Sequence, residues 1–403
     1  MTVGCGTTPA WCAVVERPDQ RVEDIPRGAF APPHCPHPDC PCHHPGRGRD
    51  FRWSKVGSYT VKRSGAAIQR FLCHSCRRTF SQQTFACTYF LKRPELLLPV
   101  AAGLLAGSAH RQLARSLGCA PSTITRLAPR IGRHSLLLQR RLELEAAEIR
   151  EPVVLDDFVS FVGAQFYQLA VPTAVGQSSA FVYRLDHALH LRGGRLNPHQ
   201  RRRRDALLRR HGRPSAGART RAVVRVLRAL LAQSRTLRLV SDGCPLYDRA
   251  LQQLQAQRRV EHRRFPNPPR GPKGAPRSPA ARERDLQMFE VDQLHRLVRH
   301  SLAHHRRETI AFSRSVNGLV ERLHLLAVWR NLVKRRSERR PHRATPAATL
   351  GLTTGRWSWA QVFAQRLFVG HLPLTDDDQQ IYRRQTPTPM LHVQRPHDPV
   401  YVL

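Results

Sequence analysis

The chain has 403 residues, 41% of them hydrophobic, so it is long enough for two or three domains with a sizeable core. Its 66 Lys and Arg residues against 29 Asp and Glu residues give a formal net charge of +37. This excess favours a polyanionic partner over a small neutral metabolite. The sequence shows neither an apolar run of the roughly 20 residues that a bilayer requires nor the features of a signal peptide. We therefore expect a cytoplasmic protein that needs no membrane and no small-molecule cofactor.

Composition and periodicity divide the chain into five parts. In chain order we predict a flexible arm (1–30), a zinc-ribbon-like module (31–90), a helix-turn-helix module (93–133), an α/β core (150–340) and a C-terminal tail (341–403). A helix over 134–148 is expected to connect the second module to the core. Within the core, residues 192–221 form a strongly basic insert.

The cysteines of the 31–90 module have the spacing of a metal site. Cys35 and Cys40 enclose four residues, Cys73 and Cys76 enclose two, and two strand-like runs lie between the pairs. Two short knuckles brought together by a hairpin supply the four ligands that a structural Zn²⁺ ion takes. One ligand could instead come from Cys42 or from a neighbouring histidine, namely His34, His37, His43, His44 or His74. The alternative is a set of buried thiols without metal.

The 93–133 segment predicts helices that meet at a tight turn. Apolar residues mark one face of each helix, Gly118 lies in the turn, and Pro121 suits the first turn of the next helix. A helix-turn-helix presents the polar side chains near the start of its second helix to base edges. The outward residues in this position are Ser122, Thr123, Arg126 and Arg130. An ordinary helical hairpin is the alternative.

The core predicts a mixed α/β sheet rather than a doubly wound parallel one. Three runs rich in Val, Phe and Tyr, at 152–163, 165–176 and 179–191, have connections too short for a crossover and should be antiparallel. Two later strands, at 237–243 and 258–265, are reached through helices and should add in parallel. Helical stretches at about 283–307 and 315–336 close the core.

Few acidic residues occur on the apolar elements of this basic chain. Asp156 lies inside the first strand, Asp242 ends the fourth, Asp292 lies on the next long helix and Glu321 on the helix after it. A carboxylate in such a place is costly unless it is paired or bound to metal. Carboxylates from two strands and a helix can hold two Mg²⁺ ions for phosphoryl transfer. The alternative is that they only neutralise arginines, which is as good an explanation for Asp157 and Glu290.

Several stretches, in this order, resemble a known family. They are QRFLCHSCRRTFSQQTF, LDDFVSFVG, LVSDG and VDQLHRLVRHSLAHHRRETIAFSRS. Together they are similar to the DDE transposases of bacterial insertion sequences, in particular those with an N-terminal zinc ribbon. The resemblance covers roughly residues 35–365 and rests on the order of the motifs.

The resemblance implies an RNase H-like catalytic fold and dependence on Mg²⁺, for which Mn²⁺ can substitute. It also implies cleavage and joining of double-stranded DNA ends by a homo-oligomer in a prokaryotic nucleoid. By position, Asp156 and Asp242 match the first and second acids, and Asp292, with Arg299 seven residues later, matches the third. The family usually has Glu at the third position, so Glu290 and Glu321 stay open as alternatives. The basic insert would grip DNA phosphates.

Two other functions compete with a transposase. One is a DNA-binding protein without catalysis, either a decayed transposase or a regulator, which Asp at position 292 favours. The other is an RNase H-like nuclease that cuts without joining.

Overall fold

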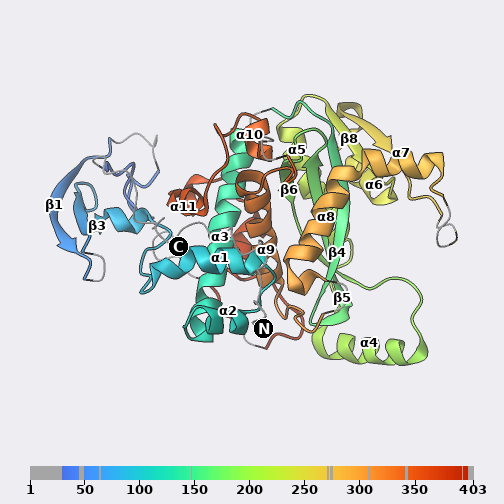
Figure 1. Ribbon diagram of the computed structural model, residues 1–403, viewed down its shortest axis with the longest axis horizontal. Coiled ribbons are helices and arrows are strands. Elements are labelled where there is room, and N and C mark those ends of the chain that lie inside the picture. The colour runs from blue at the N-terminus through green and yellow to red at the C-terminus, as the bar shows by residue number, and fades with distance from the viewer. Residues whose placement is uncertain are drawn as a thin grey trace, which may run out of the picture.

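The computed structural model describes residues 30–397, apart from 45–49, 63–64, 147, 270–271, 273–275, 307–308, 341–343 and 393. The predicted arm, except Phe30, lies outside the described residues. A small cysteine-bearing module stands at one end of the molecule, a group of helices follows, and a larger sheet lies beyond them (Figure 1). None of the described helices combines the length and the apolarity that a membrane crossing requires.

The N-terminal module is built on a three-stranded antiparallel sheet. Its strands are β1 (Trp53–Thr60), β2 (Ala67–Cys73) and β3 (Thr79–Ser81), in that order across the sheet. Phe71, Phe80 and Phe85 form a small aromatic core beside the cysteines. Such a core is too small to hold a module of this size together, so a metal ion would add stability that burial does not supply.

Three helices follow: α1 (Leu97–Leu105), α2 (His110–Ser116) and α3 (Pro121–Glu145). The predicted second helix of the 93–133 module and the predicted connecting helix over 134–148 are one continuous helix. The separation at position 133 is therefore wrong. Helix α3 runs through the middle of the molecule beside α9 (Val316–Val328) (Figure 1).

Gly132 lies one residue before the predicted boundary, inside the continuous helix, and packs against α9. A Cβ atom at Gly132 would lie 2.4 Å from the Cβ atom of Glu321 on α9. The glycine therefore lets two helices approach each other closely and does not end one of them. A sequence pattern alone does not distinguish these two roles.

The larger sheet is mixed, as predicted. It contains β4 (Val153–Val162), β5 (Ala164–Gly176), β6 (Val182–Leu185), β7 (Ala188–Leu191), β8 (Leu237–Ser241) and β9 (Val260–Arg264). The strand order is β6-β5-β4-β8-β9, and β7 also pairs with β5. β4, β5 and β6 are antiparallel neighbours, whereas β8 is parallel to β4 and β9 to β8. The third predicted run is split into β6 and β7, which both pair with β5.

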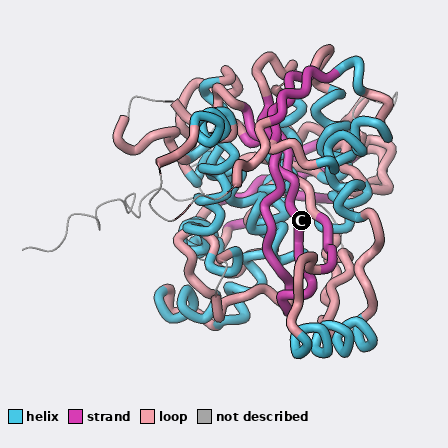
Figure 2. The backbone as a smooth tube through the Cα atoms, turned by 90° about the vertical axis from the view of Figure 1, so that its right-hand side faces the viewer, coloured by secondary structure: helices cyan, strands magenta, loops and turns pink. Residues whose placement is uncertain are grey.

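Helices cover both faces of this sheet (Figure 2). Helix α5 (Ala218–Ala232) packs on β5, β6 and β7 and against α6 (Pro245–Gln253). Helix α8 (Phe289–Ser301) packs on β4 and β5. The stretch predicted as one helix over 283–307 is divided at Met288 into α7 (Pro279–Gln287) and α8.

Short turns complete the regular structure. The 3₁₀ turns are Gln82–Phe85, Pro94–Leu96, Gln257–Arg259, Ala303–His305 and Val369–His371, and Trp329–Val333 continues α9 as a π-helical turn.

The basic insert contains a helix, α4 (Pro198–His211), that stands away from the body of the molecule (Figure 1). Asn197 caps its N-terminus by accepting a hydrogen bond from the Gln200 amide, and only Leu208 on it is buried. It carries six arginines: Arg201, Arg202, Arg203, Arg204, Arg209 and Arg210. A helix that is polar on all sides gains little from packing, and its exposed charges are available to a partner.

The C-terminal region folds back onto the helices through α10 (Pro346–Thr349), α11 (Trp359–Ala364) and α12 (Asp376–Tyr382). Asp378 anchors it. The carboxylate accepts hydrogen bonds from Arg140 Nη2 at 2.6 Å and from Arg184 Nη2 at 3.1 Å, and Glu143 pairs with both arginines. Burial raises the pKa of Asp378, but the two arginines outweigh it and hold that pKa well below its usual range.

Asp378→Ala should lower the free energy of unfolding by about 3–5 kcal/mol, because it leaves buried guanidinium groups short of a counter-charge. Since the folded-state pKa is depressed, this contribution is present at neutral pH and is lost as the pH falls below the usual range of an aspartate. Denaturant unfolding at pH 7 measures the effect. Asp376→Ala, which removes an exposed carboxylate from the same helix, should cost less than about 1 kcal/mol; equal costs would contradict the anchoring role.

Candidate functional site

Four cysteine sulfurs of the N-terminal module come together. Cys35, Cys40, Cys73 and Cys76 have ligand atoms within 4.8 Å of one another. The Sγ atoms of Cys35 and Cys76 are 3.7 Å apart, and those of Cys40 and Cys73 are 3.8 Å apart. Zn–S bonds of about 2.3 Å place tetrahedral ligands about 3.8 Å apart. The cluster therefore has the dimensions of a Cys₄ site and could bind a metal such as zinc.

The alternative ligands lie outside this cluster. Cys42 is buried, and its amide donates a hydrogen bond to Cys40 Sγ at 3.4 Å, but its own sulfur is not among the four grouped atoms. The histidines considered as substitutes are not among them either. Burial raises the pKa of the Cys35 thiol, so a bound cation would be needed to hold it as the thiolate.

The sheet brings Asp156 and Asp242 side by side. β4 and β8 are parallel neighbours in which Leu155 pairs with Ser241. Asp156 follows Leu155 on β4 and Asp242 directly follows the end of β8, so the two residues lie on neighbouring chains about 4.8 Å apart. The amide of Cys244 donates to Asp242 Oδ1 at 3.0 Å, and the amide of Asp157 to Asp156 Oδ1 at 2.8 Å.

The surroundings of Asp156 disfavour the ionised form of its carboxyl group. Burial, together with the charge of Asp242 and a smaller contribution from Asp292, raises the pKa of Asp156 to about 7. Burial raises the pKa of Tyr247 on α6, and the charges of Asp157, Asp156 and Asp242 raise it further. Like charges held together in a partly buried place are expensive without a cation. Such a pair is therefore a candidate site for a divalent ion.

Asp292 lies near this pair but is engaged elsewhere. Its carboxylate forms an ion pair with Arg284 of α7. Among the described residues, Asp156, Asp242 and Asp292 do not form a group whose ligand atoms all lie within 4.8 Å of one another. Asp292 would join the two strand carboxylates as a ligand only by leaving Arg284.

The other two acids considered for the third position have partners of their own. Glu290 pairs with Arg336 at 2.6 Å. Glu321 is buried on α9, where Arg384 lies 3.1 Å from its carboxylate. Neither contributes to the raised pKa of Asp156. Asp292 is thus the best placed of the three.

Helix α8 places two further side chains against β4. His295 Nδ1 lies 3.7 Å from Asp156 Oδ2, and burial, with Arg299 and Arg284 nearby, lowers the pKa of His295 to about 3. The Arg299 guanidinium lies over the Phe158 ring, 4.7 Å from its centre. The sequence placed Arg299 seven residues after Asp292, and in the structure both lie on α8. Arg284 could not be found in this way, because it lies across a helix boundary that the pattern did not reveal.

Asp157 points away from this pair. Its carboxylate accepts a hydrogen bond from Arg219 Nε at 2.6 Å, on the α5 side of the sheet. Burial, only partly offset by Arg219, raises the pKa of Asp157. The ion pair with Arg219 therefore explains the buried carboxylate of Asp157.

The residues predicted to contact DNA differ in their exposure to solvent. Ser122 and Arg126 are exposed and Thr123 is half-buried, all on the first two turns of α3. Arg130 is held inside, where Nη1 donates to the carbonyl oxygens of Cys87 at 2.9 Å and Tyr89 at 2.6 Å. The expectation that Arg130 faces outward is therefore wrong. It fastens the end of the cysteine-bearing module to α3.

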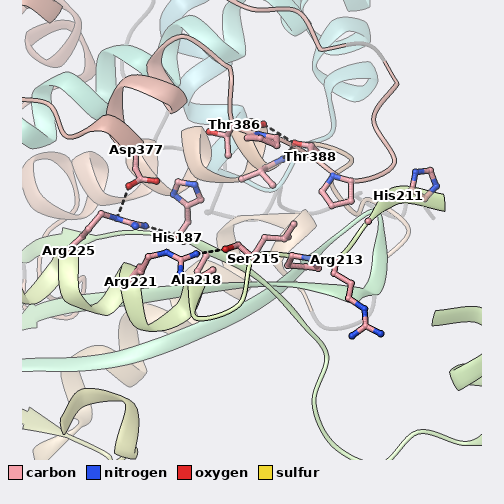
Figure 3. A pocket seen from close by; sticks show the side chains of 17 residues that line it. His187, His211, Arg213, Ser215, Ala218, Arg221, Arg225, Asp377, Thr386 and Thr388 are labelled. Atoms are coloured by element: carbon pink, nitrogen blue, oxygen red, sulfur yellow. Dashed lines mark hydrogen bonds and ion pairs between the residues drawn. The ribbon is translucent and has the colours of Figure 1, made fainter. Parts of the chain in front are cut away.

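A cavity of about 430 Å³ lies between the basic insert and the C-terminal region (Figure 3). Arg221 and Arg225 border it and are engaged by Ser215 and Asp377 respectively. None of the three candidate metal-binding acids lines this cavity, so it is separate from the acid pair.

The chain matches no protein-family model, and no curated protein shows significant similarity to it. The transposase resemblance therefore stays a prediction.

Proposed function

We propose that this protein is a DDE-type transposase, which binds DNA ends and catalyses metal-dependent strand cleavage and strand transfer. The observation that carries the proposal is the register of β4 and β8, which makes neighbours of two acids 86 positions apart in the sequence. Three consecutive antiparallel strands followed by two parallel ones agree with the RNase H-like core that the resemblance implies.

The proposed chemistry rests on the two strand carboxylates. Asp156 and Asp242 would hold Mg²⁺, and Asp292 would complete the set. A divalent ion in such a site activates a water or 3′-hydroxyl for attack on a phosphodiester and stabilises the negative charge that develops. Arg299, held over Phe158, would orient the phosphate. His295 is neutral and lies close enough to Asp156 to position its carboxylate.

Substitutions at the third position should separate a ligand from a structural acid. Asp292→Asn should reduce cleavage at least about 100-fold without unfolding the chain, whereas Asp292→Glu should retain activity because it restores the family's usual residue. Glu321→Gln should instead lower stability, since Glu321 faces Arg384 in the core. Cleavage rates and thermal unfolding of the three variants distinguish the roles. Normal cleavage by Asp292→Asn would remove it from the site.

DNA binding is proposed for two surfaces. Helices α1 to α3 have the order of a helix-turn-helix, with Ser122, Thr123 and Arg126 at the start of the last helix. The exposed arginines of α4 form the second surface, which would bind DNA phosphates independently of the base sequence.

Arg126→Ala should weaken binding to the preferred DNA sequence by about 1–3 kcal/mol, the usual contribution of an arginine that reads a base. Binding to unrelated DNA should change far less. Titration of labelled duplexes at fixed salt measures both. Arg249→Ala, which removes an exposed arginine from α6, is the matched control. An equal loss on both DNAs would show that Arg126 contacts phosphate alone.

A DNA-binding protein without catalysis is the second candidate. It is favoured by Asp at position 292 and by the ion pair that holds this Asp to Arg284. In this case the protein would keep the two DNA-binding surfaces and have no active third acid.

One experiment separates these functions. The purified protein is incubated with Mg²⁺ or Mn²⁺ and duplexes taken from the DNA that flanks its coding sequence, and the products are resolved on a denaturing gel. Free 3′-ends together with joined products support the transposase, and cleavage without joining indicates a nuclease. Tight binding without any product, at every protein and metal concentration, leaves only the non-catalytic protein.

A further inference from the structure

A second group of metal-ligating side chains lies beside the cysteine cluster. His34 and His43 belong to the N-terminal module, whereas His371 ends the Val369–His371 turn of the C-terminal region. Each offers a ring nitrogen, and these three atoms lie within 4.8 Å of one another. The centre of the His34 ring is 4.0 Å from that of His371 and 5.4 Å from that of His43.

Backbone carbonyls fix the proton on each ring. Nδ1 of His34 and Nδ1 of His43 lie 3.0 and 2.8 Å from the Cys35 carbonyl oxygen, and Nε2 of His371 lies 2.7 Å from the His43 carbonyl oxygen. A carbonyl oxygen only accepts, so these three nitrogens are the donors. The opposite nitrogen of each ring then carries a lone pair. Histidines that bind zinc have this arrangement, with one nitrogen on the metal and the other donating to a carbonyl.

The three ring nitrogens that lie within 4.8 Å of one another belong to two buried side chains and one half-buried side chain. An ion among them would give the three rings a common partner.

We propose that His34, His43 and His371 form a second zinc site, which fastens the C-terminal region to the cysteine-bearing module. Three neutral imidazoles suit Zn²⁺, with water in the fourth position. The Cys35 carbonyl connects the two sites, since Cys35 also belongs to the Cys₄ cluster. This site is independent of the proposed catalytic function.

The surrounding contacts show what the ion would stabilise. Phe368 packs edge-on against Phe85 of the module at 5.0 Å, and the Arg366 guanidinium lies 3.9 Å from the centre of the Phe30 ring. Helix α11 lies next to the module (Figure 1). Residues 283 and 336 positions apart are thus already in contact, and the ion would add bonds between the same two regions.

The metal content of the full-length protein tests the proposal. After reconstitution with Zn²⁺ and removal of loosely bound ions, native mass spectrometry should find about two zinc ions per chain in the wild type and about one in His371→Ala. His392→Ala, which removes an exposed histidine from the same region, should keep both. One ion in the wild type, or no difference between His371→Ala and His392→Ala, would overturn the proposal.

Cobalt reports which site is lost. Co²⁺ in the Cys₄ site gives sulfur-to-metal charge-transfer absorption, and Co²⁺ bound by histidines does not. His371→Ala should lose one Co²⁺ ion while its charge-transfer absorption stays unchanged. Hydrogen exchange should also become faster around residues 366–372 in this variant and stay unchanged in the strands of the module. A fall of the charge-transfer band in proportion to the metal would show that the histidines have no ion of their own.

Discussion

Asp156→Asn and Asp242→Asn should each reduce DNA cleavage by roughly 10⁴-fold or more, the size expected when one member of a catalytic unit is removed, while DNA binding stays nearly unchanged. The carboxylates lie side by side on β4 and β8, so neither can replace the other as a ligand. The surfaces proposed to bind DNA, on α3 and α4, are on other elements. Cleavage assays and binding titrations on the same preparations provide the measurement.

The stability of Asp156→Asn distinguishes a functional acid from a structural one. The folded state raises the pKa of Asp156 from 3.8 to about 7, so it prefers the protonated carboxyl. Stability is therefore lost as the pH rises between these values. In zinc-replete buffer without Mg²⁺, the amide should make the protein more stable than the wild type at pH 8, and the difference should shrink towards pH 5.

Asp376→Asn serves as the control, because it changes an exposed carboxylate to an amide and should alter neither cleavage nor the pH dependence. A loss of stability or of DNA binding in Asp156→Asn would mean that this acid supports the fold. The catalytic proposal would then fail.

Cys73→Ser should remove the metal of the cysteine cluster and unfold the N-terminal module. Structural zinc contributes about 10–16 kcal/mol in small metal-dependent folds, and the aromatic core here is small. Cys73 lies at the end of β2 and is fully buried, so the loss of this ligand also disturbs the hairpin. Zinc content and hydrogen exchange across residues 50–85 measure the effect. The larger sheet, which has its own core, should stay folded.

Cys42→Ser is the matched control. Cys42 is as buried as Cys40 but lies outside the group of four sulfurs. It should keep the zinc of that cluster and lose little stability. If Cys42→Ser releases the metal and Cys40→Ser does not, the ligand set is the alternative one that the sequence left open.

The parts of this structure that could be predicted are those set by local pattern. The spacing of Cys35, Cys40, Cys73 and Cys76 indicated a four-sulfur cluster because both knuckles flank a hairpin. Connection lengths fixed which strands are antiparallel and which parallel. The neighbourhood of Asp156 and Asp242 depends on the pairing of β4 with β8, which the sequence alone did not give.

The parts that could not be predicted depend on contacts between distant segments. The role of Gly132 depends on Glu321, the pairing of Asp292 on Arg284, and the inward position of Arg130 on two carbonyls of the preceding module. The contact of His34 and His43 with His371 joins the segments that lie farthest apart in the sequence among these examples. A periodicity of 3.6 or 2 residues describes one element at a time and carries no information on its partner.

Because α3 is continuous, it fixes the distance between the groups that it carries near its two ends. Its first turns carry Arg126, and its last turns carry Arg140, which is tied to the region beside the larger sheet through Asp378. These two residues are 14 positions apart, or about 21 Å along the helix axis, which is about six base pairs of DNA at 3.4 Å each. If the protein reads and cuts DNA as we propose, one residue inserted into α3 would rotate its two ends relative to each other by about 100° and would change how the recognised sequence is placed relative to the cut bond.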